Sequence, residues 1–98
     1  MTINKTKNDA EMTLALEGRL DTTTAPQLEA ELKDSLDGVT DLTLDFQLLE
    51  YISSAGLRVL LAAQKVMNQQ GTMKIKNAGP DIMEVFEITG FSDILTFA

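Results

Sequence analysis

The sequence predicts a single α/β domain over residues 1–98, built on a sheet of about four to five strands that is mostly parallel after an amino-terminal hairpin. Segments with the two-residue period of strands alternate with segments of helical period in the order β-β-α-β-α-β-α. Helix-length connections favour parallel strands joined by right-handed crossovers. The strands alternate apolar and polar residues, whereas a doubly covered parallel sheet shows continuous apolar runs. We therefore expect three or four helices mainly on one face.

The chain is expected to open with a hairpin. Residues 2–7 and 11–16 have strand patterns, and the turn-rich tripeptide Asn8-Asp9-Ala10 separates them. The second strand places its apolar residues on one face, which predicts that this face lies on the core. These residues are Met12, Leu14 and Leu16.

A first helix is predicted after residue 24. Thr24 and Gln27 have the spacing of a capping box, and Pro26 suits a first helical turn. Gly38 is predicted to end this helix. The apolar residues Leu28, Leu32 and Leu36 follow at helical spacing.

The next strand, residues 39–46, leads to two serines at the start of a second helix, which should end between residues 68 and 71. A hydroxyl at a helix start can cap unpaired backbone N–H groups, and a phosphate can be held there by the helix dipole. Arg58 falls on the polar side of this helix. The buried side is predicted to carry Gly56, Val59, Leu60, Ala63, Val66 and Met67.

A third unit follows, with a short strand over residues 72–76 and a helix over residues 81–89 that stops at Gly90. The tail, residues 91–98, is apolar enough to pack as a turn or an edge strand. The loops that leave the carboxyl ends of the strands, 18–24, 47–54 and 77–80, should meet at one edge of the sheet, where open α/β sheets bind ligands. Four polar residues are then expected to be neighbours: Asp21, Ser53, Ser54 and Asn77.

The composition excludes several classes of function. A formal charge of −7 argues against nucleic-acid and anionic-membrane binding and favours protein partners with a basic face. The absence of cysteine and histidine rules out thiol nucleophiles, Ser-His-Asp triads and histidine phosphocarriers. Asp45 and Glu50 leave a carboxylate metal site open, but no nucleophile or phosphate loop lies nearby, so we expect neither catalysis nor a bound metal.

No secretory signal pattern is found at the amino terminus, and the longest apolar run, residues 59–63, is far shorter than the roughly 20 residues that span a bilayer. A soluble cytoplasmic protein is therefore expected.

Three stretches carry a resemblance to a known family: Gly18-Arg19-Leu20-Asp21, the strand of residues 41–46, and Tyr51-Ile52-Ser53-Ser54-Ala55-Gly56-Leu57-Arg58-Val59-Leu60-Leu61. Over essentially its whole length the chain resembles the STAS domain, and specifically the stand-alone bacterial anti-sigma factor antagonists. The serine-glycine-leucine segment is specific when it joins a strand to a helix, whereas Gly-x-Leu-Asp alone is weak.

The resemblance implies a partner switch. The unphosphorylated antagonist binds a serine-kinase anti-sigma factor and frees a sigma factor, and the same kinase ends the binding by phosphorylating one serine with its own bound ATP. The antagonist would need no cofactor of its own. Members of the family more often read Asp-Ser-Ser-Gly or Asp-Ser-Thr-Gly, and alignment on Gly56-Leu57 makes Ser54 the acceptor, with Ser53 the alternative. The implied partner-binding residues are Asp21, Thr22, Ser53, Gly56, Leu57 and Arg58.

Other interpretations of these residues stay open. The protein could be a STAS scaffold, or a subunit of a transport or signalling complex, in which the serines only cap the helix. Gly56 could serve close packing, Asp21 could cap the helix that follows or be a solvated loop acid, and Arg58 could be an ordinary surface residue. We expect a monomer in the absence of the partner.

Overall fold

In the computed structural model, which describes residues 1–98, four strands form one sheet in the order β1-β2-β3-β4. The elements are β1 (Thr2–Asn8), β2 (Glu11–Leu20), α1 (Ala25–Ser35), β3 (Asp41–Ile52), α2 (Ser54–Gln70), β4 (Thr72–Lys76), α3 (Pro80–Thr89) and a 3-10 turn (Phe91–Asp93).

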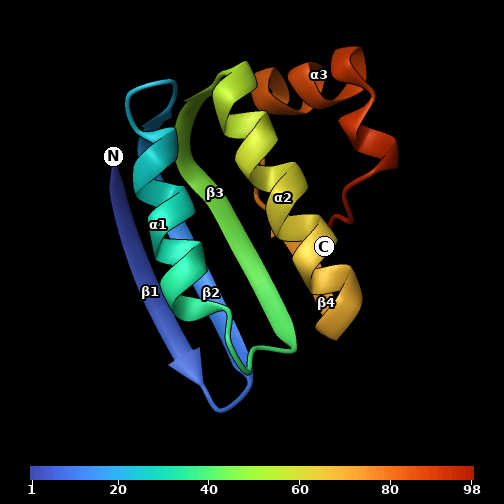
Figure 1. The fold of residues 1–98 in the computed structure, drawn as a ribbon. Coiled ribbons are helices and arrows are strands. Elements are labelled where there is room, and N and C mark those ends of the chain that lie inside the picture. Colours follow the sequence, from blue (N-terminus) through green and yellow to red (C-terminus); the bar gives the residue numbers. More distant parts are fainter.

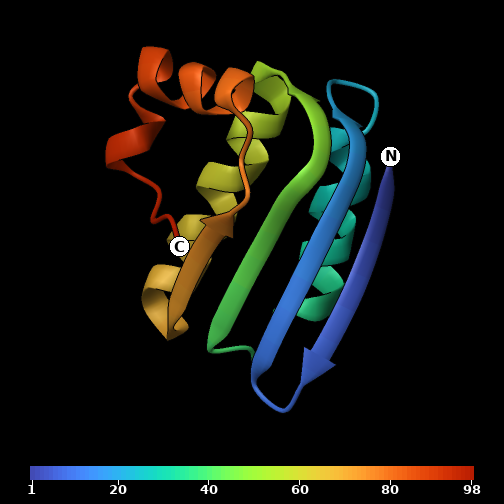
Figure 2. The same cartoon turned by 180° about the vertical axis from the view of Figure 1, so that it is seen from behind.

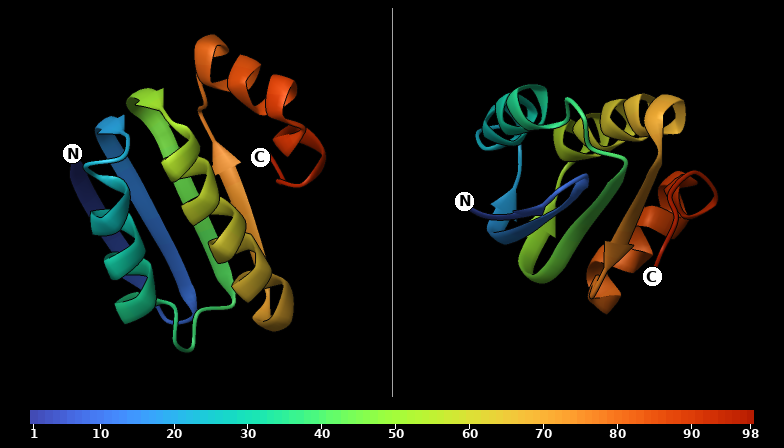
Figure 3. Two further views of the ribbon diagram at one scale, coloured as in Figure 1. Left: turned by 45° about the horizontal axis from the view of Figure 1, so that its top comes forward. Right: turned by 90° about the horizontal axis from the view of Figure 1, so that it is seen from below.

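The sheet has the predicted connectivity. β1 and β2 pair antiparallel around a turn in which Asp9 adopts a φ of 55°, and β3 pairs parallel with both β2 and β4. α1 and α2 lie side by side over one face of the sheet, while α3 lies outside this pair, beyond the carboxyl end of β4 (Figures 1 and 3). The tail after the 3-10 turn returns to β4 and pairs there through Phe97 and Ile75.

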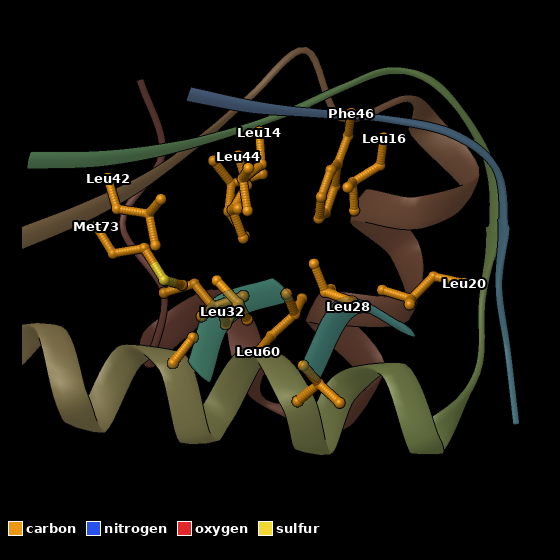
Figure 4. Packing of buried hydrophobic residues seen from close by; sticks show 14 of the residues in the cluster. Leu14, Leu16, Leu20, Leu28, Leu32, Leu42, Leu44, Phe46, Leu60 and Met73 are labelled. Atoms are coloured by element: carbon orange, nitrogen blue, oxygen red, sulfur yellow. The ribbon is translucent and has the colours of Figure 1, made fainter. Parts of the chain in front are cut away.

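The core fills the space between the sheet and these two helices. Leucine side chains of β2 and β3 point from the sheet toward Leu28 and Leu32 of α1 and Leu60 of α2 (Figure 4). α3 joins the same core through Phe86, whose ring centroid is 6.4 Å from that of Phe46 and 5.7 Å from that of Phe97. The amphipathic patterns of the sequence therefore face the core as predicted, with one exception. Val66, predicted on the buried side of α2, is 43% exposed because it lines the open groove between α1 and α2.

β3 is longer than predicted, because it continues from Phe46 to Ile52 and leaves only Ser53 before α2. Two bulges interrupt its pairing with β2: the partners change from Ala15↔Asp45 to Glu17↔Leu48, and then from Gly18↔Leu49 to Arg19↔Tyr51. Each bulge adds one residue to β3, bends it and shifts the alternation. Figure 2 shows this bend in the upper part of β3. The buried residues are consequently spaced by three, at Phe46, Leu49 and Ile52, a spacing that a two-residue period does not detect.

The start of α1 also differs from the prediction. Thr24 occupies the N-cap position and Pro26 lies in the first turn, but no capping box forms. The Thr24 hydroxyl donates to the carbonyl of Arg19 at 2.7 Å and accepts from the N–H of Asp21 at 2.8 Å. The Gln27 side chain instead donates to the carbonyl of Met1 at 3.1 Å. Thr24 therefore fixes the loop after β2 rather than the helix that follows it.

Candidate partner-binding site at the amino end of α2

The two serines differ in their access to solvent. Ser53 is the N-cap residue of α2 in an extended conformation, and its N–H donates to the carbonyl of Leu20 at 2.9 Å, which ties the start of α2 to the end of β2. The Ser53 Oγ is buried and has no hydrogen-bond partner, whereas the side chain of Ser54 is exposed. Only Ser54 therefore offers its hydroxyl to another protein in this conformation.

The amino end of α2 is not neutralised by its own residues. The Ser53 side chain makes no capping hydrogen bond, contrary to the capping role expected for it, and the first turn contains no acidic residue. The unpaired N–H groups of a helix start carry a partial positive charge that favours anions. A negative group placed on Ser54 would therefore meet a favourable field from α2.

Asp21 organises the loop beside this helix end. Its Oδ1 accepts hydrogen bonds from the N–H groups of Thr23, at 3.0 Å, and Thr24, at 3.1 Å, and its Oδ2 lies 3.6 Å from Nε of Arg19. The backbone N–H of Thr24, followed by that of Thr23 and by the Arg19 cation, holds the pKa of Asp21 below its ordinary value. Asp21 is thus a fixed carboxylate that shapes the loop, and it lies at the edge of the sheet where it was expected.

Gly56 and Leu57, which were expected at the partner surface, are buried. A Cβ on Gly56 would lie 2.7 Å from Cγ of Leu20 and 3.0 Å from Cγ1 of Ile52, so a glycine is needed for α2 to pack this closely against β2 and β3. Leu57 is only 6% exposed and belongs to the core. These two residues support the position of Ser54 from within.

Two other expected site residues are at the surface. Thr22 is exposed in the loop after β2, and Arg58 is exposed one helical turn after Ser54, on the same face of α2 as that serine. Asn77, by contrast, is held by Asp45: its Nδ2 donates to Oδ1 of that residue at 3.0 Å. The structure thus joins the loops of Asp21 and the serines directly, while Asn77 is bound to the middle of β3.

Sequence reasoning missed one pair at this edge. The guanidinium carbon of Arg19 lies 4.2 Å from the ring centroid of Tyr51, a cation–π contact between β2 and β3. The bulges that bring these residues opposite each other leave no motif in the sequence; the only available signal was an aromatic residue just before the serines.

No group of three or more acidic side chains is placed to hold a metal ion. Asp45 accepts hydrogen bonds from the N–H of Gln47 and from Asn77, both at 3.0 Å, which is the role of a structural carboxylate. None of the helices has the length and apolar character required to cross a membrane.

The fold and this edge define a small regulatory binding domain, and comparison with known proteins identifies its class. Residues 3–96 match the family described as "Mlab, STAS domain". BtrV of Bordetella bronchiseptica, assigned as an anti-sigma factor antagonist, is 41% identical over 100 residues, covering 100% of this chain and 86% of BtrV. The anti-sigma-B factor antagonist of Bacillus subtilis is 29% identical over 94 residues, covering 95% of this chain and 84% of that protein.

Solved structures show the same fold. The anti-sigma factor antagonist SpoIIAA has been solved in unphosphorylated and phosphorylated forms, with TM-scores of 0.78 and 0.77 and identities of 18% and 20%. Both comparisons cover 99% of this chain, and they cover 87% and 91% of SpoIIAA. The chain therefore belongs to the STAS-domain family. Within that family it belongs to the bacterial anti-sigma factor antagonists, which are regulatory binding proteins rather than enzymes.

Proposed function

We propose that this protein is the phosphorylatable component of a partner switch that controls sigma-factor-dependent transcription. In its unmodified form it binds a serine-kinase anti-sigma factor and releases the sigma factor, and the kinase then phosphorylates Ser54. The observation that carries the proposal is the exposed hydroxyl of Ser54 on an uncapped helix end, beside the Asp21 loop. SpoIIAA, a protein of the same fold, exists in a phosphorylated form.

Ser54 is preferred to Ser53 as the acceptor because a kinase must reach the hydroxyl from solvent. The Ser53 Oγ is buried, and its backbone is held by Leu20. Exposing it would require the junction between β2 and α2 to open.

The physical effect of the modification would be confined to the interface. A phosphate adds about −1.5 to −2 charges at neutral pH, and the free N–H groups of α2 can donate hydrogen bonds to its oxygens without loss of packing. A partner surface fitted to a neutral hydroxyl would have to desolvate this charge close to the Asp21 carboxylate. The cost is about 2–5 kcal/mol, or roughly 30- to 1,000-fold in affinity. Phosphorylation would thus end binding and leave the fold intact.

The other parts of the proposal follow from this mechanism. ATP is bound by the partner kinase, so the antagonist itself needs neither cofactor nor metal. It acts as a monomer when free, in the cytoplasm, where it meets the anti-sigma factor. Thr22 and Arg58, which are both exposed, contact the partner's surface directly.

Incubation with ATP and each serine-kinase anti-sigma factor encoded in the same genome tests the proposal. Mass spectrometry should locate one phosphate on Ser54 in the wild type and in Ser53→Ala, and none in Ser54→Ala. Native gels or calorimetry should show that the phosphorylated protein has lost affinity for the same kinase. Stable binding without any phosphate on either serine would support a scaffold instead.

A further inference from the structure

The face of the sheet that carries no helices is polar over most of its area. Its side chains are the alternate residues of the strands, including Thr13, Thr43, Asp45, Lys74 and Lys76, all of which lie between the buried positions of their strands. Figure 2 views the molecule from this side. Such a composition is that of a solvated sheet face.

Two apolar side chains depart from this pattern at the carboxyl end of β3. Leu48 is 59% exposed and Tyr51 is 41% exposed. Leu48 pairs with Glu17 and Tyr51 pairs with Arg19, two residues that point away from the helices because the flanking Leu16 and Leu20 are buried. Leu48 and Tyr51 therefore occupy neighbouring positions on the face that carries no helices.

The bulges are the cause of this exposure. Uninterrupted alternation after Phe46 would turn Leu48 into the core, whereas the first extra residue turns it out and buries Leu49 instead. The second bulge does the same for Tyr51 and Ile52. Bulges that re-aim side chains are common beside functional sites. Exposing a leucine and a tyrosine gives up burial that the fold could otherwise use, which points to a surface covered by another molecule.

This surface is continuous with the site of Ser54. Tyr51 precedes Ser54 by three residues, and Arg19 bridges the two regions by stacking on Tyr51 while its Nε lies 3.6 Å from Oδ2 of Asp21. Tyrosine and arginine are the residue types that most often supply binding energy at interface centres. A protein that covers the Asp21 loop and Ser54 therefore meets Tyr51 and then Leu48 in the same approach.

The charge around the surface indicates the chemistry of that protein. The cation of Arg19 is paired with Asp21, and neither Glu17 nor Glu50 has a cation within 4.0 Å; Glu50 is exposed, whereas Glu17 is partly buried and accepts a hydrogen bond from Nδ2 of Asn4 at 2.8 Å. We propose that Leu48, Tyr51 and Arg19 form a docking surface for the serine-kinase anti-sigma factor, which presents to it an apolar centre surrounded by lysine and arginine. This inference rests on the proposed function, and it extends the interface from the Ser54 loop onto the sheet.

The test measures the affinity of the same genome's serine-kinase anti-sigma factor for the full chain, with ADP present so that Ser54 stays unmodified. Leu48→Ser and Tyr51→Ser should each raise Kd by about tenfold. Ile88→Ser is the matched control, because Ile88 is 76% exposed on α3 and outside this surface, and its Kd should stay within about twofold of wild type.

Glu50→Lys should weaken binding more at low salt than at high salt. With kinase at saturating concentration, Leu48→Ser should be phosphorylated as fast as wild type, because the surface provides binding and not chemistry.

Three outcomes would overturn the inference. If Leu48→Ser and Tyr51→Ser, folded by circular dichroism, bind with the wild-type Kd while Ser54→Asp does not bind, the docking surface is wrong and the switch stands. If the wild-type chain binds none of these kinases, both proposals fail. If light scattering finds a wild-type dimer that Leu48→Ser converts to a monomer, the surface is an interface between two copies of this chain.

Discussion

Gly56 in the first turn of α2 lies against Leu20 at the end of β2 so closely that a Cβ would stand 2.7 Å from the leucine Cγ. The same Cβ would stand 3.0 Å from Cγ1 of Ile52. Both leucine and isoleucine are buried and cannot move freely away. The start of α2, and with it the position of Ser54, is therefore set by a contact that only glycine permits.

Gly56→Ala should destabilise the protein by about 1–3 kcal/mol, because the added methyl group overpacks this junction. Chemical denaturation followed by circular dichroism measures the free energy of unfolding. Gly79→Ala is the control, since Gly79 has a φ of −70° and nothing within 4 Å of its Cβ position. A loss at Gly79 as large as that at Gly56 would contradict the packing argument.

Ser54→Asp should weaken binding to the kinase by at least about tenfold, because a carboxylate replaces the neutral hydroxyl at the interface. Its melting temperature should change by no more than about 3 °C, since Ser54 is exposed and a negative charge suits the helix start. Ser54→Ala should keep both binding and stability. A large fall in the melting temperature of Ser54→Asp would show that the charge acts on the fold and not on the interface.

The carboxylate of Asp21 should contribute stability at neutral pH that is lost in acid. The N–H groups of Thr24 and Thr23 hold its pKa below the ordinary value of 3.8, so the folded state favours the charged form. The contribution is complete above 3.8 and declines as the pH falls through the lower pKa of the folded protein. Thermal unfolding of wild type and Asp21→Ala should therefore differ by a constant amount from pH 7 to pH 5, and by less at about pH 3. A difference that grows in acid would contradict this assignment.

Gln70 at the end of α2 holds the connection between α1 and β3. Its Nε2 donates to the carbonyl of Leu36 at 2.7 Å and to that of Val39 at 2.6 Å. Gln70→Ala should cost about 1–2 kcal/mol, because both carbonyls lose this donor and that of Leu36 keeps only the N–H of Val39. Gln69→Ala, an exposed neighbour on α2, should change the free energy of unfolding by less than about 0.5 kcal/mol. Equal losses for both would indicate a helix-end effect instead of these two bonds.

Much of the fold could be predicted from local periodicity. The hairpin, the three helices and the strand Thr72–Lys76 have regular patterns and clear stops, such as Gly90 with its left-handed φ of 81°. The end of β3 could not be predicted, because its bulges depend on pairing with β2, which is not local. The residues after Phe46 therefore looked like a loop.

The candidate site was likewise predicted only in part, because some of its features follow from local patterns and others depend on tertiary contacts. The edge of the sheet and the exposure of Ser54 follow from the order of elements and from the start of α2. The burial of Gly56 and Leu57 depends on how close α2 comes to Leu20, and the partner of Thr24 depends on where the chain leaves β2. These are tertiary contacts that helical spacing and capping rules do not contain.

Because of the two bulges, the number of residues between Phe46 and Ile52 decides which side chains of this segment face the core. In most strands, exchanging a side chain leaves the other residues on the same face of the sheet, and so does changing the length of a neighbouring loop. Here the removal of a single residue would reverse which side chains reach water from that point to the serines. Homologous chains that preserve this count keep the same positions on the core side and on the outer face, while those that alter it must present a different surface to their partner.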